Sequence, residues 1–306
     1  MGAYTKYYIL IILPLLILAW SEWIGFEEMQ VIGFLLVGVW VTGIPHGGLD
    51  HLVAKKSAQD LNQPFSILSF LVKYLGRMVI FGLIWLISPV LGLLGFICLS
   101  ALHFGEIDLQ YFKWPHQTLY RVFAFAYGVS ILGGLFLTHL EEVNTILHQF
   151  PFVHGWDTLY RFLVSHEGVI EAMGITTILI GLLWLGAITN QWKAAQHSIS
   201  ILLVWWLILW RLPLLMGFAV YFCCWHAILT FMELKNFMGF SWIQLSKKAI
   251  PFSLIALVGI FALIGIFWYF NHPELLWPVL FIGIALLTAP HGEVMDFLFL
   301  RRRVEN

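Results

Sequence analysis

Residues 213–234 read PLLMGFAVYFCCWHAILTFMEL, a mostly apolar stretch with one histidine, His226, inside it. A helix of about 20 apolar residues spans the hydrocarbon core of a bilayer. An ionisable side chain at that depth costs several kcal/mol unless another group satisfies it. The stretch therefore predicts a transmembrane helix, and it predicts that His226 has a partner elsewhere in the chain.

The rest of the chain has the composition of a polytopic membrane protein. Of its 306 residues, 60% are hydrophobic and 11% are charged, against about 25% charged residues in a soluble domain. No alternating pattern typical of a β-barrel is present, so the spans are predicted to be helices. Cutting the chain at charge clusters, prolines and glycines gives ten candidate spans: 7–26, 29–48, 67–88, 89–105, 118–139, 168–189, 198–212, 213–234, 250–270 and 275–298.

This pattern predicts an all-α, polytopic membrane bundle of about ten helices that forms a single domain, 1–306. The expected number of transmembrane helices is eight to ten, because 67–105 can be one span plus an interfacial helix and 198–212 is short. The first apolar run lacks a cleavage pattern and is expected to be retained as a span. The longest connection, 141–167, is expected to lie along the membrane surface as an amphipathic segment.

Charge placement predicts the orientation, because loops rich in Lys and Arg stay in the cytoplasm. With ten spans and both termini cytoplasmic, the inner side collects 12 of the 16 basic residues. These are Lys6, Lys55, Lys56, Lys113, Arg121, Lys193, Lys235, Lys247, Lys248, Arg301, Arg302 and Arg303. The outer loops hold Glu22, Glu27, Glu28, Glu141, Glu142, Asp157, Glu167 and Glu274. The predicted location is the inner (plasma) membrane of the cell, and the nearly balanced charge gives no indication of nucleic-acid binding.

Four histidines share one depth in this topology. His46, His103, His226 and His291 lie in the second, fourth, eighth and tenth spans, each past the midpoint toward the cytoplasm. A single intramembrane histidine is as often a hydrogen-bonded helix contact as a ligand, but four at one level favour a shared metal. Neutral imidazole binds Zn, Fe, Cu and Ni, and a site of imidazoles with open positions suits a redox metal.

Carboxylates follow three of these histidines closely. They are Asp50, Glu106, Asp108, Glu293 and Asp296. A carboxylate that accepts the second ring N–H of a ligating histidine fixes its tautomer, and this is the role predicted for them. The alternative is that they are solvated where the helices leave the membrane. Pro45 and Pro290 directly precede two of the histidines and are expected to kink those spans.

Side chains beside the candidate ligands are candidates for a substrate site. They are Phe104, Tyr221, Trp225 and Thr230. For the aromatic residues the alternative is packing, which explains most aromatic side chains in such a chain. His51 is a fifth candidate ligand, although the basic loop beside it favours a surface role. The other histidines are expected to be interfacial: His116, His139, His148, His154, His166, His197 and His272.

Four motifs contain the four histidines: GIPHGGLDH at 43–51, SALHFGEID at 100–108, YFCCWHAIL at 221–229 and TAPHGEVMDFLF at 288–299. Their order and spacing resemble the Brp/Blh family, the bacterial and archaeal membrane β-carotene 15,15′-dioxygenases, over essentially the whole chain. The resemblance implies an all-helical membrane enzyme with non-haem Fe²⁺ held by histidines. It implies O₂ as co-substrate, central cleavage of β-carotene to two molecules of all-trans-retinal, and a functional link to a retinal-binding rhodopsin. It also favours two spans within 67–105.

One position departs from that family. Some members have a second histidine four residues after the one that matches His226, whereas this chain has Thr230. The fourth ligand is then His291, or a water molecule beside three imidazoles, or His51.

Two other functions are compatible with buried histidines in a membrane protein. A di-iron desaturase or hydroxylase needs clustered boxes such as H-x-x-H-H, and the sequence has no such box. A transporter or proton pathway predicts polar residues at many depths of the membrane, whereas the predicted topology concentrates them at one level. The residues therefore favour a histidine-liganded metalloenzyme over these alternatives, and the resemblance implies that it is an Fe²⁺ dioxygenase acting on a lipid-dissolved polyene.

Overall fold

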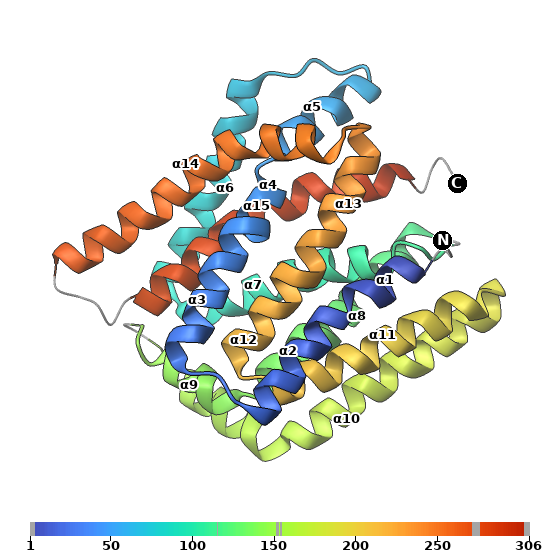
Figure 1. Cartoon of the computed structure of the whole chain (residues 1–306), viewed down its shortest axis with the longest axis vertical. Helices are drawn as coiled ribbons and strands as arrows, with labels where there is room; N and C mark the ends of the chain where they lie inside the picture. The colour runs from blue at the N-terminus through green and yellow to red at the C-terminus, as the bar shows by residue number, and fades with distance from the viewer. Residues whose placement is uncertain (1–3, 115, 151–152, 154, 271–275, 303–306) are drawn as a thin grey trace.

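The computed structural model describes residues 4–114, 116–150, 153, 155–270 and 276–302. Every regular element in these ranges is a helix and none is a strand, which confirms the predicted all-α class (Figure 1). With η marking a π-helix, the first elements are α1 (Thr5–Leu10), α2 (Ile12–Trp23), α3 (Glu28–Gly38), η1 (Val39–Gly43), α4 (Ile44–Gly47), α5 (Asp50–Asp60), α6 (Ile67–Ile87), α7 (Pro89–Asp108) and α8 (Gln117–Leu137). The remaining elements are α9 (Leu140–Leu147), α10 (Trp156–Thr189), α11 (Trp192–Arg211), α12 (Leu214–Ala219), η2 (Val220–His226), α13 (Ala227–Met238), α14 (Trp242–Tyr269) and α15 (Leu276–Arg302).

Within these described ranges, nine helical segments are long and apolar enough to cross a membrane. They begin at Thr5, Glu28, Ile67, Pro89, Gln117, Trp156, Trp192, Leu214 and Trp242, and they match the first nine predicted spans in order. The tenth predicted span, 275–298, coincides with α15, which is not one of the nine. The start of α1 and the end of α15 lie on the same side of the bundle in Figure 1. Their cytoplasmic orientation stays a prediction from charge.

The stretch 67–105 forms two helices, as the resemblance favours. α6 ends at Ile87 and α7 begins at Pro89, and Ser88 between them is extended. The Ser88 hydroxyl accepts a hydrogen bond from the backbone N–H of Leu91 at 3.3 Å. A serine cap followed by proline at the first helical position is a strong helix start, so the local sequence explains the break.

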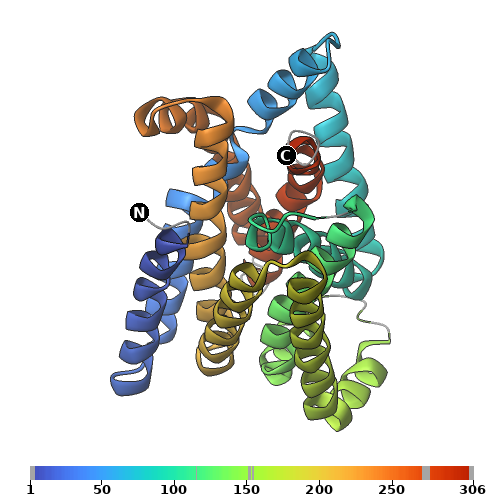
Figure 2. The same cartoon turned by 90° about the vertical axis from the view of Figure 1, so that its right-hand side faces the viewer.

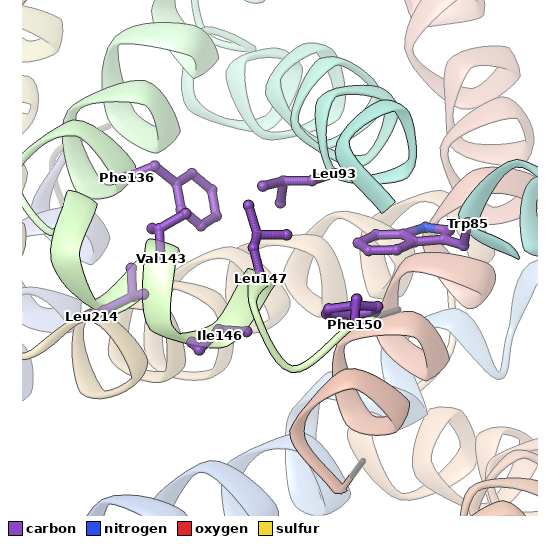
Figure 3. A pocket seen from close by; sticks show the side chains of 8 residues that line it. All are labelled: Trp85, Leu93, Phe136, Val143, Ile146, Leu147, Phe150 and Leu214. Atoms are coloured by element: carbon purple, nitrogen blue, oxygen red, sulfur yellow. The ribbon is translucent and has the colours of Figure 1, made fainter. Parts of the chain in front are cut away.

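The surface segment predicted at 141–167 is shorter than expected, because α10 begins at Trp156 rather than at 168. Asp157 in its first turn favours this start by interacting with the positive end of the helix dipole. α9 occupies the first part of the segment and turns Val143 and Leu147 inward. Figure 3 shows these side chains facing Trp85 around a cavity of about 20 Å³ that is lined by apolar and aromatic residues. α9 thus covers the ends of α6, α7 and α8.

α7 and α8 pack backbone to backbone through two pairs of small residues. A Cβ placed on Gly105 of α7 would lie 1.8 Å from the carbonyl oxygen of Ala124 on α8. A Cβ placed on Gly128 of α8 would lie 1.8 Å from the carbonyl oxygen of Ala101 on α7. Small residues four apart on facing helices allow this close approach in membranes, and the contact fixes the turn of α7 that carries His103.

α15 runs through the middle of the bundle. Figures 1 and 2 both place it between α6 on one side and α13 on the other, and it contacts α5, α6, α7 and α14. Pro290 lies inside α15, directly before His291. The last predicted histidine is therefore carried into the centre of the molecule.

A candidate metal centre

Four buried histidines from distant parts of the chain meet inside the bundle. One ring nitrogen from each of His46 on α4, His103 on α7 and His291 on α15 lies within 4.8 Å of those from the other two. The ring of His226, the last residue of η2, is centred 4.7 Å from that of His103 and 5.7 Å from that of His46. The exposed fraction of each of the four side chains is 5% or less. The four candidate ligands therefore form one cluster, with His226 at its edge.

Many ring nitrogens of this cluster have no hydrogen-bond partner. Among the side chains that the structure describes, both nitrogens of His103, both of His226 and Nε2 of His291 are buried and unpaired. Each buried polar atom without a partner costs about 1–3 kcal/mol, so a cluster of them calls for a further group. An all-imidazole donor set is one that Fe, Zn, Cu and Ni accept. The residues present therefore fit a transition-metal ion.

One π-helix ends on a clustered histidine, and another ends three residues before one. η1 ends at Gly43, just before His46, and η2 ends on His226 itself. π-Helices are rare overall, and those that occur are often found at functional sites. The Thr42 hydroxyl joins the two by donating to the Cys223 carbonyl at 2.9 Å, and the Thr42 carbonyl lies 3.3 Å from Nδ1 of His46. This contact at Nδ1 leaves Nε2 of His46 available to bind a metal. In the sequence, only the four-residue spacing between Thr42 and His46 indicates the contact.

Asp50 contacts a histidine, but not the one that precedes it by four residues. Its Oδ1 lies 2.8 Å from Nδ1 of His291, and its Oδ2 accepts a hydrogen bond from the Tyr74 hydroxyl at 2.9 Å. A carboxylate at Nδ1 favours the tautomer whose Nε2 lone pair can bind a metal. Asp50 therefore has the geometry of an orienting carboxylate, with Tyr74 as an additional partner that sequence reasoning missed.

Asp50→Asn is expected to weaken metal binding by about 10- to 100-fold, because the neutral amide cannot stabilise the Nδ1–H of His291 as the carboxylate does. The measurement is a metal titration of the purified protein in detergent. Glu293→Gln is the matched control, because Glu293 is exposed and pairs with Arg77 rather than with a histidine. Equal metal affinities of the two variants would contradict the role given to Asp50.

Asp108 contacts two of the predicted substrate residues instead of a histidine. Its carboxylate accepts hydrogen bonds from the Tyr221 hydroxyl and from the Trp225 indole N–H, both at 2.9 Å. All three side chains are buried. Asp108 therefore ties α7 to η2 and fixes the π-helix that ends on His226.

Two of the remaining predicted carboxylates pair with arginines. Glu293 pairs with Arg77 on α6, and Asp296 pairs with Arg121 on α8. These ion pairs join α15 to its two neighbours. Glu106 is buried one turn after His103 on α7, and its backbone carbonyl accepts a hydrogen bond from a tyrosine hydroxyl of α8.

The other predicted substrate residues pack on His226. The ring of Phe104 is centred 4.1 Å from that of His226. The Thr230 hydroxyl donates to the backbone carbonyl of His226 at 2.9 Å, and its side chain is fully buried. Thr230 thus adds a hydrogen bond within the helix, and no second histidine follows His226 by four residues.

A cavity of about 620 Å³ adjoins the cluster. His291, Asp50 and His51 line one part of it, together with Phe222, whose ring is centred 5.6 Å from that of His46. His51 stacks on Phe252 with ring centres 4.1 Å apart, and it is not part of the three-histidine group. The predicted substrate residues are not among the side chains that line this cavity: Phe104, Tyr221, Trp225 and Thr230.

The structure describes five of the seven histidines expected at the interface, and the side chain of one of these, His139, is half-buried. His197 is buried among tyrosines, with its ring centred 4.4 Å from that of Tyr4 and edge-on to that of Tyr111. His116, His148 and His166 are exposed. His154 and His272 lie outside the described residues.

Comparison with known proteins identifies the family. The family model described as β-carotene 15,15′-dioxygenase matches residues 37–299. The chain belongs to this family. A relative from an uncultured marine bacterium, 66A03, named β-carotene 15,15′-dioxygenase, is 29% identical over 275 residues, which is 84% of this chain and 90% of the relative. No solved structure matches the chain.

Membership in the β-carotene 15,15′-dioxygenase family confirms the resemblance drawn from the four motifs. It makes the chain a carotenoid-cleaving dioxygenase, which is an oxidoreductase. The matched range contains all four clustered histidines and excludes α1 and α2.

Proposed function

We propose that the chain uses Fe²⁺ and O₂ to cleave β-carotene at its central 15,15′ double bond and releases two molecules of all-trans-retinal. The observation that carries the proposal is the cluster of buried imidazoles with unpaired nitrogens. The family supplies the substrate and the bond that is broken. His46, His103, His226 and His291 are the proposed ligands of the iron.

The proposed reaction balances without a further oxidant or reductant. The C15=C15′ bond breaks, and each of its two carbons forms a carbonyl with one atom of O₂. The four electrons that reduce O₂ come from the two bonds of that double bond. Bound Fe²⁺ would supply the activation of O₂ that this addition needs.

The side chains of this protein orient the ligands and keep water away from the cluster. The Thr42 carbonyl and the Asp50 carboxylate each contact Nδ1 of one histidine, so the Nε2 atoms of His46 and His291 are left free. Phe104 packs against His226 and Phe222 packs against His46, so apolar rings border the cluster. A dry, apolar site suits a polyene and limits side reactions of a reactive oxygen species.

The transporter alternative has less support than the enzyme. A proton or ion pathway needs polar groups at successive depths. The buried polar side chains of α7 all lie in the C-terminal half of that helix: Ser100, His103, Glu106 and Asp108. The desaturase or hydroxylase alternative needs more histidines than this cluster contains.

The proposed setting is the inner (plasma) membrane, with β-carotene taken from the lipid bilayer. In the part of the chain that the structure describes, nine apolar helices support a multi-pass membrane protein. The proposed retinal product implies a functional link to a retinal-binding rhodopsin, as the family resemblance also does.

Removal and replacement of the metal tests the proposal directly. Purified protein in detergent is treated with a chelator and then reconstituted with Fe²⁺ or with Zn²⁺, and the products from β-carotene are separated by chromatography. We expect two retinals per β-carotene with Fe²⁺, and no product with Zn²⁺ or without metal. Full activity of the metal-free protein, or products of unequal length, would rule out the proposed reaction.

A further inference from the structure

The cavity of about 620 Å³ beside the histidine cluster is elongated. On α14 its lining runs from Phe252 to Leu263, a distance of about 17 Å along a helix. At the Phe252 end, Ser253 packs on Gly48 just after the His46 turn. At the other end, α14 meets α15 where Ile260 packs near Gly283. One end of the cavity is therefore at the cluster and the other is more than two helical turns away.

The rim of the cavity is apolar and exposed. Leu75 of α6 is 56% exposed, and Ile255 and Leu263 of α14 are 68% and 39% exposed. Both helices are among the nine apolar segments that can cross a membrane. Their outward surfaces therefore face acyl chains, and the opening between α6 and α14 leads to the lipid phase rather than to water.

Small residues keep the cavity wide. Gly43, Gly47 and Gly48 line its inner end, and Ala256 and Gly259 line it along α14. Its lining is otherwise mostly aliphatic and aromatic, and the polar groups stand near the cluster. A volume of this size is within the range of ligand sites, about 300–1,000 Å³. A long, rigid, apolar molecule with no hydrogen-bonding groups along its length is the ligand class that matches this lining.

We propose that this cavity is a chamber for one arm of the polyene, which enters sideways from the bilayer between α6 and α14. The arm lies along α14, so that the central double bond is placed at His46 and His291. This assignment rests on the proposed function and adds the location of the substrate arm and its route of entry. It also makes Ala256 a residue that limits the size of the arm.

The test compares two substrates in variants that narrow the chamber. Ala256→Phe fills its middle, and Gly259→Leu narrows it at a position where an added Cβ would meet no atom within 4 Å. Ala262→Phe is the matched control, because Ala262 is exposed on α14 and does not line the cavity. The substrates are β-carotene and β-apo-8′-carotenal, which keeps one complete arm and lacks the end ring of the other.

We expect the ratio of kcat/KM for β-carotene to that for β-apo-8′-carotenal to fall at least about tenfold in Ala256→Phe and Gly259→Leu. The shorter arm still fits a narrowed chamber, so cleavage of the apocarotenal and the metal content should persist. The ratio should be unchanged in Ala262→Phe. If the wild type is active and the ratio is unchanged in both chamber variants, the chamber assignment is wrong and the proposed function still stands. A wild type that cleaves neither substrate would instead overturn the proposed function.

Discussion

His103→Ala is expected to abolish retinal formation, with a loss of more than about 100-fold, and to lower the metal content of the purified protein. Removing a ligand should cost more than removing a side chain that only orients one, which typically costs about 10- to 100-fold. His103 belongs to the group of three histidines whose ring nitrogens lie within 4.8 Å, and both of its nitrogens are unpaired. Its contribution is therefore to the metal and not to a hydrogen-bond network. The measurement is retinal production in β-carotene-producing cells together with metal analysis.

His148→Ala is the control for this experiment. His148 is exposed at the end of α9, where it contacts the Asn144 carbonyl and Asp157, so retinal formation should be unchanged. His46→Ala, His226→Ala and His291→Ala should behave like His103→Ala. Full activity and metal in His291→Ala would show that His291 is not the fourth ligand, while leaving the other three in place.

The candidate site was largely predictable because its chemistry is unusual for its surroundings. A histidine in an apolar span is costly wherever it occurs, and four of them at one predicted depth already indicated a shared partner. The charge of the loops set that depth. The helical class and the order of the spans followed from hydropathy alone.

The partners of the histidines were not predictable, because they depend on contacts between distant helices. Asp50 was expected to orient His46 from one turn away, yet it contacts His291, 241 residues further along the chain. Glu293 and Asp296 were expected to face the histidines, and arginines of α6 and α8 pair with them instead. Hydropathy gives the depth of a residue but not the direction in which its helix is rotated.

The aromatic residues show the same limit of sequence reasoning. Tyr221 and Trp225 both precede His226 closely in the sequence, but η2 turns their side chains toward Asp108. Phe222, between them, faces the cavity and His46. A π-helix changes the register of the side chains that follow, and no simple sequence period predicts where one occurs.

Gly105→Ala is expected to destabilise the protein strongly. The added methyl group would lie 1.8 Å from the carbonyl oxygen of Ala124, and a backbone atom cannot rotate away as a side chain can. Overpacking usually costs about 1–3 kcal/mol, and we expect the upper end of that range because α7 and α8 must separate along their shared face. The measurement is thermal unfolding in detergent, with retinal formation and metal content on the same sample.

Gly174→Ala on α10 separates this effect from the general effect of replacing a helical glycine. A Cβ at Gly174 meets no atom within 4 Å, so the substitution should raise stability by about 0.5–1 kcal/mol through the higher helix propensity of alanine. Opposite shifts in melting temperature for the two variants would support the close approach of α7 and α8. If Gly105→Ala melts at or above the wild-type temperature, the two helices are farther apart than described, and the position of His103 beside His291 loses its structural support.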